Sequence, residues 1–124
     1  MQTDIEIYLL KPEQEALNQW LMARFGQLGA NPWPNLPQGA WGGMVIWQQQ
    51  NIPIMLVPKA SGQFASLWFN SPNTPWPDDL SCAQEIHAAL GIEVRCSPSG
   101  WQEDKDSELW YQLRQGQLNL IPWH

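Results

Sequence analysis

Apolar and polar residues alternate over residues 3–10, near the start of the chain. Ile5 and Leu9 belong to one face of an extended segment, and Asp4 and Glu6 belong to the other. This period of two predicts a half-buried first strand. We expect this strand to lie at an edge of its sheet, where acidic side chains discourage pairing with another chain.

A helix is predicted to follow this strand, beginning at Pro12. Proline suits the first helical position, because a helix start leaves that N–H unpaired in any case. Apolar residues then recur at helical spacing from Leu17 to Leu28, and we expect the helix to end near Gly26 or Gly29.

Three strands are expected in the middle of the chain, over residues 41–49, 54–58 and 64–69. Turn-forming residues between them predict two hairpins. The last of the three segments is apolar on both faces, so it should be a central strand that is covered on both sides. A second helix should begin at Ser81, which forms the spacing of a capping box with Gln84.

The second helix should stop at Gly91, and a strand over 92–96 should follow. The remaining segment leaves two alternatives open. Residues 109–115 fit a short helix that precedes a last strand over 118–123, and the same two segments also fit a β-hairpin.

The predicted element order is β-α-β-β-β-α-β-(α)-β, which indicates an α+β fold. We expect a mostly antiparallel sheet of five to six strands with two main helices packed on it. The chain has no linker and no internal repeat, so residues 1–124 should form a single globular domain.

Tryptophan is the unusual feature of the composition, with nine residues in a chain of 124. Each indole combines a large apolar surface with one N–H group that needs a hydrogen-bond partner. Nine rings should exceed what so small a core can take up, so some are expected in a groove or at an interface. The candidate binding residues are Trp33, Trp76, Trp41, Trp101 and Trp123.

A Pro-Trp-Pro sequence surrounds both Trp33 and Trp76. The flanking prolines restrict the backbone, which would present each ring to a ligand or partner at low entropic cost. The alternative interpretation is that each ring folds back over the end of the core, as most large aromatic residues of small domains do.

The charge balance restricts the class of partner. Six Lys and Arg residues against twelve Asp and Glu give a net charge of −6, which argues against nucleic acid and favours a basic protein. No apolar run is long enough to span a membrane, and the N-terminus lacks the pattern of a signal peptide. We therefore expect a cytoplasmic protein with free cysteines.

Cys82 is the strongest candidate for a catalytic residue. A helix start would favour its thiolate, with His87 or His124 as the base. However, five positions separate Cys82 from His87, which is about 140° around a helix, so the two side chains do not share a face. Asp78 and Asp79 would also oppose an anionic sulfur. A small buried side chain is the simpler interpretation.

Metal and cofactor sites are not expected. The two cysteines and two histidines lack the short spacings of zinc ligands. The acidic run 103–108 lacks the turn glycine and ligand spacing of a calcium loop. Gly42 and Gly43 begin a strand and indicate a bulge or a close packing point.

These observations favour a non-catalytic, cytoplasmic protein-binding domain of accessory, inhibitor or immunity type, whose exposed tryptophans contact a protein partner. One alternative is a pocket for a small molecule or sugar, with Trp33, Trp76 and Trp41 around it. Another is a thiol-dependent enzyme that uses Cys82. A homodimer formed through the edge of the first strand or a tryptophan patch is also compatible with the pattern.

Overall fold

The computed structural model describes residues 4–98 and 109–123. Its strands are β1 (Ile5–Leu10), β2 (Trp41–Trp47), β3 (Gln50–Ser61), β4 (Phe64–Phe69), β5 (Val94–Cys96), β6 (Leu109–Arg114) and β7 (Gln117–Pro122). The helices are α1 (Gln14–Phe25) and α2 (Asp79–Leu90).

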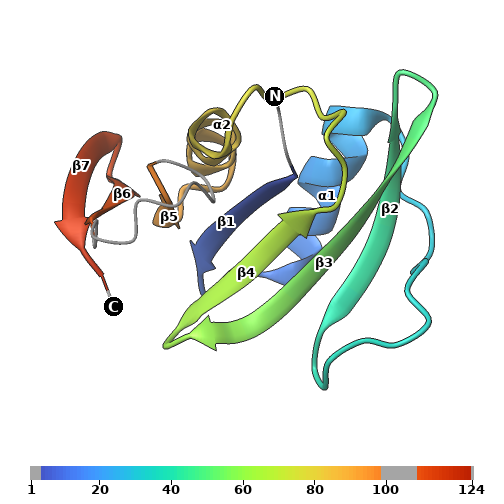
Figure 1. The fold of residues 1–124 in the computed structure, drawn as a ribbon, viewed down its shortest axis with the longest axis horizontal. Helices are drawn as coiled ribbons and strands as arrows, with labels where there is room; N and C mark the ends of the chain where they lie inside the picture. Colours follow the sequence, from blue (N-terminus) through green and yellow to red (C-terminus); the bar gives the residue numbers. More distant parts are fainter. Residues whose placement is uncertain (1–3, 99–108, 124) are drawn as a thin grey trace.

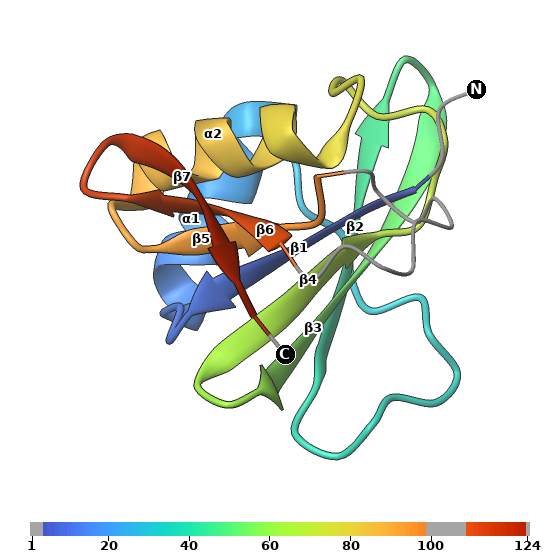
Figure 2. The same cartoon turned by 60° about the vertical axis from the view of Figure 1, so that its left-hand side comes forward.

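The seven strands form one sheet in the order β2-β3-β4-β1-β5-β6-β7, and every neighbouring pair is antiparallel. Both helices lie against one face of this sheet, and the other face carries no helix (Figures 1 and 2). The α+β class and the mostly antiparallel sheet are therefore confirmed, although the sheet has more strands than the expected five to six.

β1 lies in the middle of the sheet, so the expectation of an edge strand is wrong. It pairs with β4 on one side, where Ile7 faces Leu67, and with β5 on the other, where Leu9 faces Val94. Alternation along a strand reports which side chains are buried on each face, and it contains no information about the neighbouring strands.

The main core lies between the sheet and the two helices. Fully buried side chains from β1, β3 and β4 pack against Leu17 and Leu21 of α1 and Ile86 of α2. The segment expected to be central, residues 64–69, is indeed flanked by two strands and has only one half-buried residue, Trp68.

The helix ends follow from local chemistry. Both helices stop at glycines in the left-handed conformation, Gly26 with φ of 83° and Gly91 with φ of 70°. The start of α2 differs from the prediction, because the Asp78 carboxylate accepts the Ser81 N–H at 2.8 Å. Asp78 is the N-cap, and the Ser81–Gln84 capping box is therefore wrong.

The C-terminal segment is a hairpin, so of the two alternatives the hairpin is confirmed and the short helix over 109–115 is wrong. β6 and β7 pair in register from Leu109 with Pro122 to Arg114 with Gln117. The turn residues Gln115 and Gly116 both have positive φ, as a two-residue hairpin turn requires. Pairing of β6 with β5 adds a long-range contact that a short helix would not make.

The sheet curls around its helix-free face. The rings of Phe64 in β4 and Trp123 just beyond β7 have centroids only 5.0 Å apart, although three strands separate β4 from β7. In a flat sheet four interstrand steps of about 4.8 Å would hold these strands about 19 Å apart. Figure 2 shows the end of β7 turned toward β4. The curl makes the helix-free face concave at this position.

Candidate functional site

The tryptophans are divided between the two faces of the sheet. Trp76 is buried, with 3% of its surface exposed, and the other described tryptophans are half-buried, so none is fully exposed. The helix side carries Trp20, Trp41, Trp47 and Trp76, and the helix-free face carries Trp33, Trp68, Trp110 and Trp123. Trp101 lies outside the described residues.

Trp76 belongs to the main core. Its ring stacks on Trp20 with centroids 6.2 Å apart and meets Phe69 edge-on at 5.0 Å. Its indole N–H donates to Glu85 Oε1 at 3.0 Å, and Glu85 also forms an ion pair with Arg24 at 2.6 Å. The ring and its N–H are therefore both engaged inside the fold.

Trp33 covers the opposite face of the sheet. Its indole N–H donates to the Ile54 carbonyl at 2.9 Å, and its ring stacks on Trp68 with centroids 5.4 Å apart. A Cβ at Gly42 would lie 2.8 Å from the Trp33 ring and would collide with Asn31, so Gly42 is a close packing point. Because Trp33 and Trp76 lie on opposite faces, they do not form the rim of one pocket.

A second aromatic cluster occupies the concave part of the helix-free face. The rings of Tyr8, Trp110 and Trp123 meet edge-on, with centroids 5.0–5.6 Å apart. The Arg95 guanidinium lies 4.4 Å from the Phe64 centroid and 4.8 Å from that of Trp123. These rings make a small second core, which explains how a short chain accommodates so many indoles.

The residues proposed for thiol chemistry do not meet. Cys82 and Cys96 are free and fully buried. Burial, with the nearby carboxylates adding to it, raises the pKa of Cys82 well above its ordinary value and that of Cys96 to about 12. A nucleophilic cysteine requires the opposite, a lowered pKa and access to substrate. His87 lies elsewhere, with both ring nitrogens bonded to backbone.

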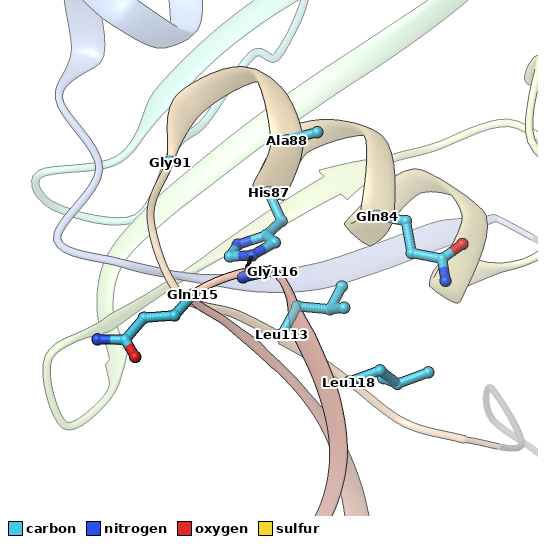
Figure 3. A pocket seen from close by; sticks show the side chains of 8 residues that line it. All are labelled: Gln84, His87, Ala88, Gly91, Leu113, Gln115, Gly116 and Leu118. Atoms are coloured by element: carbon cyan, nitrogen blue, oxygen red, sulfur yellow. Dashed lines mark hydrogen bonds between the residues drawn. The ribbon is translucent and has the colours of Figure 1, made fainter.

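A cleft of about 580 Å³ opens between α2 and the β6–β7 hairpin (Figure 3). His87 closes one end of it: its Nδ1 lies 2.7 Å from the Ile92 carbonyl oxygen, and its Nε2 accepts the Gly116 N–H at 3.0 Å. Its other lining residues are small, apolar or uncharged polar ones. They are Gln84, Ala88, Gly91, Leu113, Gln115, Gly116 and Leu118.

The edge strand β7 borders this cleft and exposes leucines. Leu118 is 44% exposed and Leu120 is 55% exposed, and Leu109 of β6 beside them is 44% exposed. Register places Leu118 opposite Leu113 on the helix side of the sheet, beyond the area that α2 covers. Three of the five exposed large apolar residues in the described part of the chain therefore lie on this hairpin.

The free backbone groups of β7 belong to the same leucines. In a two-residue hairpin the pair that closes the turn, here Arg114 and Gln117, exchanges both backbone hydrogen bonds, and bonded and non-bonded pairs then alternate. Leu118 forms a non-bonded pair with Leu113, and Leu120 forms one with Tyr111. The backbone N–H and C=O groups of both leucines therefore point away from β6. No described residue pairs with this side of β7.

The other edge of the sheet is partly closed. Gly29 bridges β2 at Met44, donating its N–H to the Met44 carbonyl at 2.7 Å and accepting the Met44 N–H at 3.3 Å. β7 has no such cover among the described residues and no charged side chain between Gln117 and Pro122. Residues 117–121 carry neither a charge nor a proline, two features by which natural edge strands avoid pairing with another chain, and Pro122 limits the open edge to this stretch.

Sequence reasoning did not find this surface, because it concentrated on tryptophan. The available signal was the alternation Leu118-Asn119-Leu120 after the turn residue Gly116, in a segment without charge. That pattern is typical of a strand, but only the sheet order shows that the strand is at an edge.

Comparison with known proteins adds no relative: no family model, curated protein or solved structure matches the chain. Over residues 4–98 and 109–123, no group of three or more His, Cys, Asp or Glu side chains is arranged to hold a metal ion. In the same residues neither helix has the length and apolar character needed to cross a membrane.

Proposed function

We propose that this chain is a non-catalytic protein-binding domain that holds an extended segment of a partner protein along β7. The observation that carries the proposal is the coincidence of two features at Leu118 and Leu120. Both residues combine an exposed apolar side chain with backbone N–H and C=O groups that have no partner in the sheet. A partner strand would satisfy the backbone groups and cover the leucines in one step.

The cleft beside β7 would supply specificity. In strand addition the backbone bonds are common to all sequences, and pockets for alternate side chains select among them. A strand placed next to β7 projects every second side chain toward α2, where the cleft lies between Gln84, Ala88 and Leu118. The lining favours an apolar or uncharged side chain at that position, because it contains no charged residue.

Electrostatics favours a basic partner at long range only. The net charge of −6 would steer a basic protein toward the domain, whereas β7 itself is uncharged. We therefore expect salt to slow association with little effect on dissociation. Two copies of this chain repel each other through the same charge, which is why we propose a different protein as the partner.

The test uses a displayed library of random linear peptides selected against the purified chain. We expect enriched peptides with apolar residues at alternate positions. Binding should fall at least tenfold in Leu120→Arg and persist in Ile46→Arg, a matched control at the other sheet edge with a side chain 46% exposed. Amide exchange should slow at Leu118 and Leu120, while Asn119, already bonded to β6, should change little.

Two results would overturn the proposal. One is the absence of an enriched motif, or binding that Leu120→Arg does not change. The other is a wild-type dimer in light scattering that Leu120→Arg dissociates, because β7 would then be covered by a second copy instead of a partner protein.

A further inference from the structure

A groove of about 310 Å³ lies where β1 leads into α1, away from the β7 surface. Its apolar lining comes from Leu56 and Ala65 in the sheet and from the rings of Trp41, Pro12 and Pro58. The Trp41 ring lies over Gly43, where an added Cβ would be 2.5 Å from the ring, so the absence of a side chain at Gly43 leaves room for the indole. The groove shares no lining residue with the α2–β7 cleft.

The charged residues of the groove are both lysines. Lys11 and Lys59 line it, and no carboxylate does. Both are exposed, and neither forms an ion pair with any residue in the described part of the chain, in contrast to Arg24 and Arg95. On a chain of net charge −6, the described lysines are thus concentrated at one apolar groove.

The backbone holds both lysines in an unusual conformation. Lys11 has φ of 44° and Lys59 has φ of 53°, in the left-handed region that non-glycine residues rarely adopt. Lys59 lies in the irregular part of β3 between Val57 and Ser61, where the register with β4 shifts. Lys11 is held by its N–H, which donates to the Gln63 carbonyl at 3.2 Å. An interruption of strand register such as the one at Lys59 redirects side chains.

We infer that this groove binds a small aromatic carboxylate. The ring of the ligand would pack on Trp41 and the two prolines, and its carboxylate would accept hydrogen bonds from the two lysine ammonium groups. The volume is at the lower end of the range of small-molecule pockets, about 300–1,000 Å³, which limits the ligand to a compact ring system. Charge complementarity selects an anion, because the lining has two cations and no acid.

The test compares three probes of one shape and different charge: 2-naphthoate, neutral 2-naphthamide and the cation 2-naphthylmethylammonium. Binding is measured by calorimetry, and its location by the NMR signal of the Trp41 indole N–H, assigned with Trp41→Phe. We expect naphthoate to bind and to shift this signal, with the amide at least tenfold weaker and the cation weaker still.

Variants isolate the two lysines. Lys11→Gln and Lys59→Gln should each weaken naphthoate binding about tenfold and leave naphthamide binding unchanged, because only the charged hydrogen bond is lost. Lys59→Arg should retain binding, and so should Arg114→Gln, which removes an exposed cation elsewhere. Unchanged NMR spectra of the free variants verify that each one folds.

Three results would overturn the inference. They are equal affinity for naphthoate and naphthamide, no naphthoate binding up to millimolar concentration, and naphthoate-dependent shifts at β7 in place of Trp41. Each is independent of the peptide selection, because that experiment reports on β7 alone.

Discussion

His87 joins α2 to the C-terminal hairpin through both of its ring nitrogens. Nδ1 faces the Ile92 carbonyl oxygen and must donate, and Nε2 accepts the Gly116 N–H. Only the neutral imidazole with its proton on Nδ1 satisfies both bonds. His87 is thus a structural link that positions one end of the cleft beside β7.

Replacing His87 by Ala should loosen the hairpin turn. Loss of two hydrogen bonds should lower the free energy of unfolding by about 1–2 kcal/mol. Amide exchange at Gly116 should accelerate, which NMR can follow at single residues. Gln84→Ala is the control, since Gln84 lines the same cleft and should change neither quantity. Unaltered exchange at Gly116 in His87→Ala would contradict the assigned link.

Asp79 makes stability depend on pH. Burial, with repulsion from Asp4, Glu6 and Asp78 adding to it, raises its pKa from 3.8 to about 6, although its bond from the Glu6 N–H acts in the opposite direction. The folded chain therefore takes up this proton at higher pH than the unfolded chain. Stability should rise as pH falls through about 6, and the gain is complete below about 4.

The measurement is urea denaturation between pH 7.5 and 5. Wild type should gain roughly 1 kcal/mol from Asp79 over this range, after allowance for solvent screening of a partly exposed group. In Asp79→Asn the free energy of unfolding should depend less on pH over this range, because the contribution of Asp79 is absent. A slope that is the same in both proteins would show that the Asp79 carboxyl does not titrate differently on folding.

At the scale of elements, the aromatic cluster of the helix-free face holds the end of β7 against β4. The Arg95 guanidinium lies over the rings of both Phe64 and Trp123, and it forms an ion pair with the Glu93 carboxylate at 2.8 Å. Glu93 also accepts the Gln112 side-chain N–H at 2.9 Å. The aromatic cluster therefore contacts the hairpin on the helix-free face, and His87 bonds to it on the helix side. Neither contact covers the outer edge of β7.

Trp123→Ala should release the end of β7. Removing a half-buried indole in contact with three rings should lower the free energy of unfolding by about 2–3 kcal/mol, less than for a fully buried ring. Thermal unfolding gives the size of the effect, and amide exchange at Ile121 gives its location. Pro122→Ala, at an exposed neighbour, is the control. Equal stability of the two variants would contradict this role.

At the scale of the whole molecule, the two cysteines report on the main core. Cys82 in α2 and Cys96 in β5 are completely buried in the same apolar cluster. Neither thiol can react without opening of that core, because reaction requires an exposed thiolate.

An aromatic disulfide reagent at pH 8 should therefore modify both cysteines slowly and at the same rate, and urea should accelerate both together. Mass spectrometry of digested protein separates the two sites. Rapid modification of Cys82 alone in the folded chain would show local access at α2, and would restore a thiol-dependent reaction as an alternative.

The local pattern of the sequence predicted both main helices and the class of fold, but it left residues 109–115 open between a helix and a strand. Alternation at Ile5, Ile7 and Leu9 identified β1, Gly91 marked the end of α2, and Gly26 was one of two predicted ends of α1, because these features depend on neighbours in the chain. The N-cap of α2 was misplaced by three residues, since Asp78 and Ser81 are both good caps and only the folded backbone shows which one is used.

Tertiary structure determined the order of the strands and the division of the tryptophans between the two faces of the sheet. The position of β1 between β4 and β5, the pairing of β6 with β5 and the curl that joins Trp123 to Phe64 all depend on contacts between distant residues. The number of tryptophans was visible from the start, but their division between the two faces was not. Periodicity assigns a side chain to one face of its own strand, whereas long-range pairing determines what lies against that face and which edge stays open.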